Sequence, residues 1–210
     1  MAAARRALLV PTVPHEPHPR TPFALRRAMT GSVFDEHPGG GEEFGWAWEG
    51  GEMLQVLNLS RSDVFDPRTS RLAQLVRVTQ RQVIVACIPA YRFRAGGISD
   101  AIADVTHVVQ ATTDVAESAF GYPLPTLVAL TAVDELAANE RADVIAAAAA
   151  AVAPHPLRVT SARTHEGVEE LKRELLTRTG LVGGVTPRPG GVRLGTHVAP
   201  KPAHATSRCW

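Results

Sequence analysis

Two short apolar stretches of the chain, residues 125–134 (PTLVALTAVD) and 157–163 (LRVTSAR), end in small polar or charged side chains, and a helical pattern follows each of them. In open α/β sheets, ligands lie at the carboxyl ends of such strands. We therefore expect a small-molecule site here. Its candidate residues are Thr131, Asp134, Ser161, Ala162 and Arg163.

Each of these positions also has a purely structural interpretation. Aspartate is a favoured residue at the start of a helix, so Asp134 could cap the helix that follows its strand. Residues 161–163 could form a simple turn between a strand and a helix. The residue types alone leave both alternatives open.

A His-Glu-Pro-His stretch, with His15, Glu16 and His18, has the His-x-x-His spacing that can chelate a metal. Pro17 and Pro19 stiffen this stretch, and the sequence offers no cysteine and no evident third ligand beside it. We therefore expect no metal site.

A basic-aromatic cluster, residues 91–94 (YRFR), follows another apolar run. It could bind an anion or a partner protein, but a solvated loop is the simpler expectation. Trp46 and Trp48 would share one face of a strand, either as core or as a partner surface. The eight histidines and two cysteines form no Ser-His-Asp or Cys-His arrangement, so we assign no catalytic residue.

The composition excludes several classes of protein. The 22 basic and 21 acidic residues give a net charge of +1, which provides no electrostatic reason to expect nucleic acid or a membrane surface as partner. Cys87 and Cys209 lie far apart and form no disulfide framework, so we expect a reducing, cytoplasmic location. No run approaches the length of about 18 apolar residues that a membrane span needs, and the apolar run before Pro11 is too short for a signal peptide.

The hydrophobic pattern predicts elements along most of the chain. The expected strands are 6–10, 44–49, 52–59, 83–89, 125–131 and 157–161. The expected helices are about 22–30 (capped by Thr21), one starting at Asp66-Pro67, one capped by Ser99 or Asp100 and closed by Gly121, about 136–153, and 167–179.

Strands that alternate with helices predict a three-layer, doubly wound α/β fold with a mainly parallel sheet and helices on both faces. Gly50-Gly51 indicates a tight hairpin, which places one antiparallel strand at an edge of that sheet. We expect one domain over residues 1–180. Residues 181–210 are rich in glycine and proline, and we expect them to form a disordered tail.

Three stretches resemble a small P-loop GTPase domain of the bacterial, translation-factor-related type. Residues 161–175 (SARTHEGVEELKREL) are similar to the family's Ser-Ala-Lys motif and the helix after it, and 128–136 (VALTAVDEL) lies where the family has Asn-Lys-x-Asp. Residues 25–31 (LRRAMTG) resemble the end of the family's first helix. The resemblance implies a six-stranded sheet of order 2-3-1-4-5-6, with the second strand, 44–49, antiparallel to the others.

The phosphate-binding parts of the family are missing. The loop Gly-x-x-x-x-Gly-Lys-Ser/Thr should fall between Val10 and Phe23, but residues 11–23 (PTVPHEPHPRTPF) contain no glycine and no lysine. A phosphate cradle needs inward-facing backbone N–H groups and a lysine, whereas each proline removes one N–H. Where the family has Asp-x-x-Gly, this chain has Asn58 and Arg61. We therefore expect no ordinary GTP hydrolysis and no bound magnesium.

The resemblance gives the five candidate residues a specific role, the recognition of guanine. Asp134 would accept hydrogen bonds from the base, and the backbone at 161–163 would donate one to the guanine oxygen. The first hypothesis is a GTPase-like module that regulates or binds a protein partner without hydrolysing nucleotide. The second is an unconventional GTP- or GDP-binding protein whose phosphates contact Arg20, His15 and His18. The third is a doubly wound domain for another small ligand, with the resemblance fortuitous.

Overall fold

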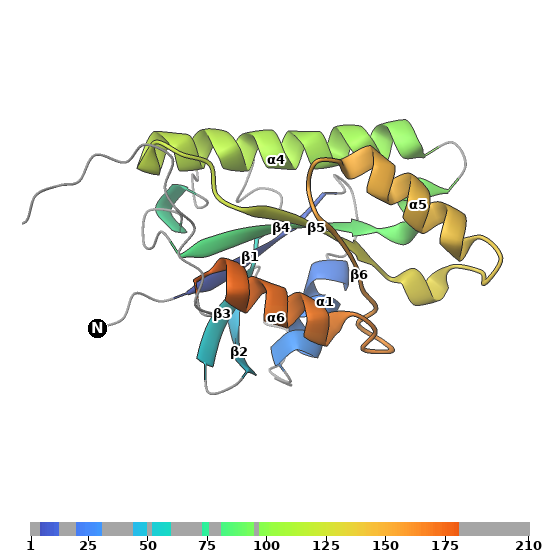
Figure 1. Cartoon of the computed structure of the whole chain (residues 1–210), viewed down its shortest axis with the longest axis horizontal. Helices are drawn as coiled ribbons and strands as arrows, with labels where there is room; N and C mark the ends of the chain where they lie inside the picture. The colour runs from blue at the N-terminus through green and yellow to red at the C-terminus, as the bar shows by residue number, and fades with distance from the viewer. Residues whose placement is uncertain are drawn as a thin grey trace, which may run out of the picture.

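The computed structural model describes residues 5–12, 20–30, 44–49, 52–59, 73–75, 81–94 and 97–180. The hypotheses that concern the histidines at 15 and 18, the candidate tail at 181–210 and most of the helix after Asp66 lie outside these residues. Figure 1 shows a twisted sheet between two helical layers.

Six strands form one sheet of order β2-β3-β1-β4-β5-β6. Every neighbouring pair is parallel except β2 with β3. The strands are β1 (Arg6–Pro11), β2 (Phe44–Glu49), β3 (Glu52–Asn58), β4 (Gln82–Pro89), β5 (Thr126–Thr131) and β6 (Leu157–Val159). The predicted fold class, strand order and edge hairpin are therefore confirmed.

Alternate residues of the central strands face opposite sides of the sheet, which divides the core in two. On one face, residues such as Leu8, Ile84 and Leu130 pack against the helices α4 (Ile98–Phe120) and α5 (Arg141–Val152). On the other face, Leu9 and Val85 belong to a second cluster with residues of the helices α1 (Arg20–Thr30) and α6 (Val168–Arg178). The apolar residues Val168, Leu171, Leu175 and Leu176 of α6 are all buried in this second cluster.

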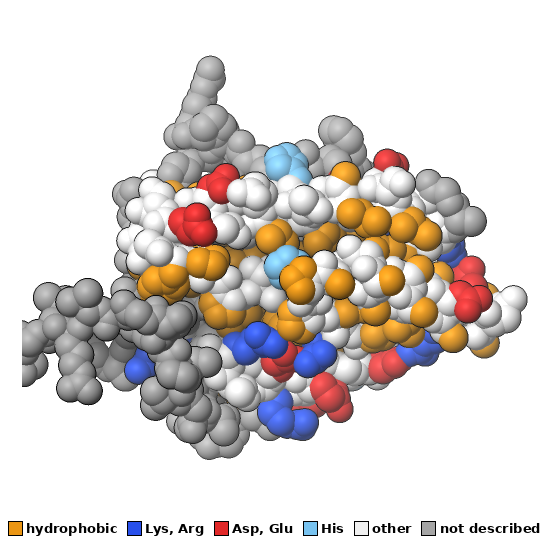
Figure 2. All heavy atoms as spheres, turned by 45° about the horizontal axis from the view of Figure 1, so that its top comes forward, with side chains coloured by type: hydrophobic (Ala, Val, Ile, Leu, Met, Phe, Trp, Pro, Cys, Tyr) orange, Lys and Arg blue, Asp and Glu red, His pale blue; other side chains and the backbone are white. Residues whose placement is uncertain are grey.

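The outer face of α4 and α5 carries a band of hydrophobic side chains, which Figure 2 shows between and beside the two helices. The band follows from composition, because α5 is built mainly of alanine. Among the described helices, none is long and apolar enough to cross a membrane.

Four local expectations were wrong. Helix α1 begins at Arg20, so Thr21 is inside it and does not cap it. Helix α4 begins at Ile98 with Gly97 as its N-cap, so neither Ser99 nor Asp100 has that role.

The other two differences lie beside the candidate site. Residues 90–93 form a short 3-10 helix, η1 (Ala90–Phe93), where a solvated loop was expected, and Phe93 is buried in the core. The helix expected from residue 136 begins at Arg141, after a second 3-10 turn, η2 (Val133–Glu135). Glu140 accounts for this delay, because its carboxylate accepts a hydrogen bond from the backbone N–H of Ala137 and binds Arg94 of the neighbouring segment.

Candidate functional site

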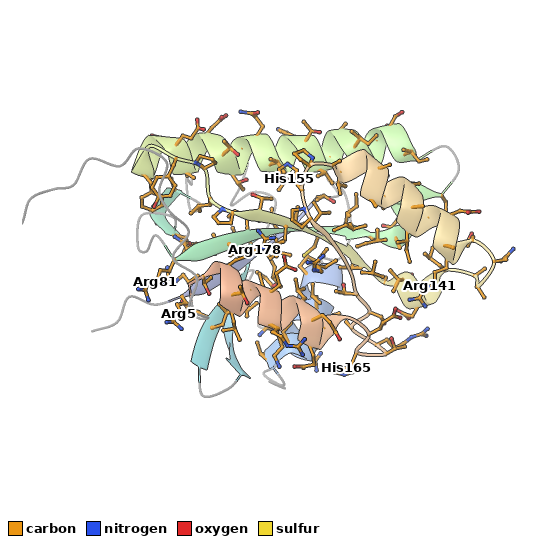
Figure 3. All side chains as sticks on the ribbon, in the orientation of Figure 1. Arg5, Arg81, Arg141, His155, His165 and Arg178 are labelled. Atoms are coloured by element: carbon orange, nitrogen blue, oxygen red, sulfur yellow. The ribbon has the colours of Figure 1, made fainter. Side chains whose placement is uncertain are left out.

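The parallel strands all end at one side of the sheet, which we call the carboxyl edge. Figure 3 shows Arg141 at this end of the molecule and Arg5 and Arg81 at the opposite end, where β1 and β4 begin. Buried polar side chains are concentrated at the carboxyl edge, whereas the strands themselves are apolar. This edge is where the sequence predicts a ligand.

A row of three buried threonines joins the strand ends to one another. Thr12 donates its hydroxyl to the carbonyl of Cys87 (3.1 Å), Thr131 to that of Ile88 (3.2 Å) and Thr160 to that of Leu130 (3.3 Å). Each bond runs from the end of one strand to its neighbour, so it adds a side-chain link to the backbone pairing at the strand ends. The hydroxyl protons of these threonines are therefore engaged inside the protein.

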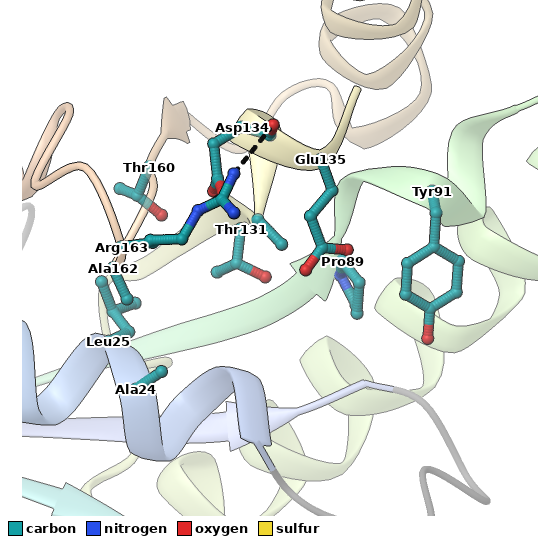
Figure 4. A pocket seen from close by; sticks show the side chains of 11 residues that line it. Ala24, Leu25, Pro89, Tyr91, Thr131, Asp134, Glu135, Thr160, Ala162 and Arg163 are labelled. Carbon is teal, nitrogen blue, oxygen red and sulfur yellow. Dashed lines mark hydrogen bonds and ion pairs between the residues drawn. The ribbon is translucent and has the colours of Figure 1, made fainter. Parts of the chain in front are cut away.

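A cavity of about 300 Å³ opens at the carboxyl ends of β4, β5 and β6, beside the first turns of α1. Figure 4 shows it from close by. Its lining residues are Ala24, Leu25, Pro89, Tyr91, Thr131, Ala132, Asp134, Glu135, Thr160, Ala162 and Arg163. Four of the five candidate residues line it, and the fifth, Ser161, contacts Asp134 behind it.

Asp134 is the central ionisable group of this cavity. Ser161 Oγ donates to Asp134 Oδ1 at 2.5 Å, and Arg163 Nε forms an ion pair with Asp134 Oδ2 at 2.7 Å. The Asp134 side chain is only 10 % exposed. Burial by itself raises the pKa of Asp134, but the hydrogen bonds from Ser161 and from the local backbone, together with the charge of Arg163, outweigh it and hold the pKa below the ordinary 3.8. The carboxylate is thus ionised at neutral pH.

The structural alternative for Asp134 is wrong. Asp134 lies within η2, and the N-cap position of α5 belongs to Glu140, six residues further on. The carboxylate of Asp134 contacts the segment after β6 and not the helix that follows its own strand. Asp134 therefore joins the turn after β5 to the segment after β6.

The backbone before Asp134 adopts an unusual conformation. Ala132 has φ 56° and ψ 34°, in the left-handed region, where a residue with a Cβ costs about 1–2 kcal/mol. This turn lets the N–H of Val133 reach the carbonyl of Thr160 at 3.4 Å and directs Asp134 toward the segment after β6. Strained backbone of this kind is concentrated at ligand sites.

The segment 161–167 is held by its own turn. The N–H of Ser161 donates to the carbonyl of Glu166 (3.0 Å), and Ser161 Oγ accepts from the N–H of Thr164 (3.1 Å). Gly167 closes the turn with φ 67°, and a Cβ there would lie 2.0 Å from the carbonyl oxygen of Val159. Contacts within its own turn therefore hold Ser161 in place, independently of its bond to Asp134.

Ion pairs surround the cavity. Arg94 of the segment after η1 binds Glu140 (2.5 Å) and lowers the pKa of that carboxyl, together with the Ala137 N–H. Arg141 pairs with Glu166, which joins the start of α5 to the loop after β6. These pairs connect the segment after η1, the start of α5 and the loop after β6.

The end of β3 carries Asn58, the position at which the resembling family has a carboxylate. Asn58 is 7 % exposed. With its amide assigned in the orientation that satisfies both ends, its nitrogen donates to the carbonyl of Pro22 (3.2 Å) and its oxygen accepts from Arg26 Nε (3.2 Å), both in α1. This side chain attaches α1 to the sheet, and both of its polar ends are engaged.

Several lining residues were not predicted as part of this site. Tyr91 and Glu135 line the cavity, and so do Ala24 and Leu25 of α1. Glu135 could have been found from its position next to Asp134. The α1 residues could not, because only the tertiary fold brings them to the cavity. Among the described residues, no cluster of three His, Cys, Asp or Glu side chains could hold a metal ion.

Comparison with solved structures identifies the fold. A structure of nucleolar GTP-binding protein 1 from Plasmodium falciparum matches 85 % of this chain and 88 % of its own, with a TM-score of 0.56 and 13 % identity. The cytosolic domain of the FeoB iron transporter from T. maritima, in a GDP form, matches 84 % of this chain and 64 % of its own, with a TM-score of 0.53 and 14 % identity.

The chain has a GTPase-like fold. Identities this low concern the architecture only, because site residues diverge more readily than strand order does. No family model and no curated protein sequence matches the chain. The activity of this GTPase-like domain must therefore be argued from its own residues.

Proposed function

We propose that this GTPase-like domain does not carry out ordinary GTP hydrolysis and acts as a regulatory or protein-interaction module. The single observation that carries the proposal is Asn58. Where hydrolysis requires a carboxylate near the metal, the chain has a neutral amide whose two ends are bound to Pro22 and Arg26 of α1. A group engaged in this way supplies no charge to a magnesium ion.

The start of α1 supports the same proposal. Phosphates bind to free backbone N–H groups at the first turn of a helix, and the family adds a lysine. In this chain Pro22 is inside the first turn of α1 and has no N–H to donate. Residues 11–23 contain no lysine and no glycine. The transferring phosphoryl group would lack the positive groups that stabilise it.

Exposed apolar side chains beside the cavity support an interaction role. Among the described residues, the large hydrophobic side chains that are clearly exposed are Tyr91, Ile98 and Ile102, at 37–39 %. Tyr91 lines the cavity, and Ile98 and Ile102 lie one turn apart at the start of α4, on the same side of the helix. A protein partner that covers this segment would also cover the mouth of the cavity. The reduced Cys87 suits the cytoplasmic location that belongs to this proposal.

A hydrolysis assay tests the proposal. The full chain is incubated with GTP and magnesium, beside the Asp134→Ala variant, and released phosphate is measured. We expect equal, background rates from both proteins. Magnesium-dependent turnover that Asp134→Ala abolishes would show that the domain is an ordinary GTPase and would overturn the proposal.

Guanine-nucleotide binding without ordinary hydrolysis is the second candidate function. The observation that favours it is the ionised Asp134 in a cavity of about 300 Å³, the place where the resemblance puts the base. GTP and GDP are titrated into the protein with and without magnesium. A dissociation constant below about 10 μM, or about −7 kcal/mol, would favour this candidate over a purely structural module.

A further inference from the structure

Arg163 occupies the mouth of the cavity. Its Nε lies 2.7 Å from Asp134 Oδ2, and its Nη2 donates to the backbone carbonyl of Asp134 at 3.5 Å. Figure 4 shows the guanidinium extending across the cavity toward Asp134. A planar group with adjacent N–H donors thus already fills the place where a ligand would meet this carboxylate.

The other side chains at the cavity offer mainly acceptors. Thr131 and Thr160 donate their hydroxyl protons to strand carbonyls, so their oxygens remain as acceptors. Glu135 adds a second carboxylate to the lining. A ligand that suits this set must bring N–H donors, and Asp134 Oδ2 requires one of them.

The two partners of Asp134 differ in how firmly they are held. Ser161 is buried and its hydroxyl also accepts the N–H of Thr164. The Arg163 side chain is 74 % exposed. An ion pair this exposed contributes little, because water screens it and the long side chain loses rotamer freedom. Oδ1 is therefore permanently engaged, whereas the partner of Oδ2 is replaceable.

We propose that Arg163 is a removable occupant of the cavity and must leave Asp134 Oδ2 when a ligand with a planar edge of adjacent N–H donors binds. A guanine base has this edge, and so has the guanidinium of an arginine side chain on a partner protein. The proposal rests on the cavity being the ligand site of the proposed function. It adds that Arg163 competes with the ligand for Asp134 Oδ2.

Two probes without a phosphate group test the proposal: the neutral guanosine and the cationic Nα-acetylarginine methylamide. Each is titrated into the full wild-type chain and into Arg163→Ala, with the amide shifts of Thr131 and Ala132 as the readout. We expect Arg163→Ala to bind at least one probe about two- to fivefold more tightly, which is the range of an exposed ion pair. The probe whose affinity increases shows whether the ligand is a guanine base or an arginine side chain of a partner protein.

Arg141→Ala is the matched control. Arg141 also forms a surface ion pair beside the cavity, with Glu166, but it does not line the cavity. Its removal changes the net charge as Arg163→Ala does, and we expect no gain in affinity. Equal gains from both variants, or no gain from Arg163→Ala, would overturn the proposal.

Salt gives a readout that a merely structural role would not produce. Rising salt weakens an exposed ion pair, so wild-type affinity for the neutral guanosine should increase with salt, whereas that of Arg163→Ala should stay constant. Affinity of Arg163→Ala for the cationic arginine probe should fall with salt, and that of wild type should fall less steeply, because salt also weakens the competing Arg163–Asp134 pair. A guanosine affinity that responds to salt identically in the two proteins would contradict the competition.

One further variant tests the role of Arg163 separately from ligand binding at the cavity. Adding Asp134→Asn to Arg163→Ala should abolish binding of either probe. If Asp134→Asn abolishes binding but Arg163→Ala gives no gain, the cavity is the ligand site and only the role of Arg163 is wrong. If neither probe binds Arg163→Ala at millimolar concentration, the cavity is not such a site, and the absence of hydrolysis is unaffected.

Discussion

Asp134 and Ser161 are 27 residues apart in the chain, and a hydrogen bond of 2.5 Å from Ser161 Oγ to Asp134 Oδ1 joins them at the carboxyl edge. The bond connects the turn after β5 with the turn after β6. It also helps to keep the Asp134 carboxylate ionised, since it lowers the pKa. The position of the Asp134 carboxylate at the cavity depends on this contact.

Ser161→Ala should therefore destabilise the protein and raise the pKa of Asp134. The variant loses the bond to Asp134 and the one from the N–H of Thr164, and a hydrogen bond to a charged group contributes about 1.5–3 kcal/mol. Denaturant unfolding measures the change. Thr177→Ala is the control, because Thr177 is exposed and bonds only within its helix, so we expect a change below about 0.5 kcal/mol. If Ser161→Ala lowers the free energy of unfolding no more than Thr177→Ala does, the Asp134–Ser161 contact adds no stability.

The depressed pKa of Asp134 predicts how stability depends on pH. A carboxyl whose folded pKa is lower than its unfolded value of 3.8 stabilises the fold above 3.8, and that contribution is lost as the pH falls through the folded pKa. Wild type should exceed Asp134→Asn in free energy of unfolding by a constant amount between about pH 5 and 7. Below about pH 4 the difference should shrink. A difference that stays constant into acid would show that the Asp134 carboxylate is not stabilised in the folded state.

The strands and their order were predictable because buried parallel strands need continuous apolar runs, which the sequence shows directly. Residues 83–89 are an example, since every residue of β4 is buried. The helix starts were less predictable. Local signals placed the start of helix α5 at residue 136. Glu140 binds Ala137 and Arg94 instead, and its contact with Arg94, across 46 residues, holds the preceding segment in another conformation.

The candidate site was predictable in position and less so in detail. Strand ends identified Thr131, Asp134 and the 161–163 segment, because the carboxyl ends of parallel strands converge. The partners of Asp134 were not predictable, since a residue that suits a helix cap locally is held by Ser161 and Arg163 from another strand. The left-handed Ala132 gave no signal either, because alanine rarely adopts that conformation.

Gly167→Ala should lower the free energy of unfolding by more than about 2 kcal/mol. The alanine would have to keep the left-handed φ of Gly167, at a cost of about 1–2 kcal/mol. Its Cβ would also lie 2.0 Å from the carbonyl oxygen of Val159, which is a steric overlap. Gly121→Ala is a matched control, because Gly121 has φ 74° and no atom within 4 Å of the added Cβ. It should show the conformational cost alone. If the two variants lose equal stability, the close approach of Gly167 to Val159 has no energetic effect.

Restoring part of the family motif should raise guanosine affinity without restoring GTP hydrolysis. Thr131→Asn with Ala132→Lys recreates Asn-Lys-x-Asp around Asp134, and a lysine beside a bound purine ring can add a cation–π contact of about 0.5–2 kcal/mol. Guanosine affinity should rise about tenfold.

The added charge is matched by Ala150→Lys, at an exposed position of α5, which should leave the guanosine affinity unchanged. GTP hydrolysis should stay at background in both variants, because the phosphate half still lacks its lysine and Asn58 remains bound to α1. An affinity no higher than that of Ala150→Lys would show that the cavity does not bind guanine, whereas hydrolysis by the double variant would show that the phosphate half is functional.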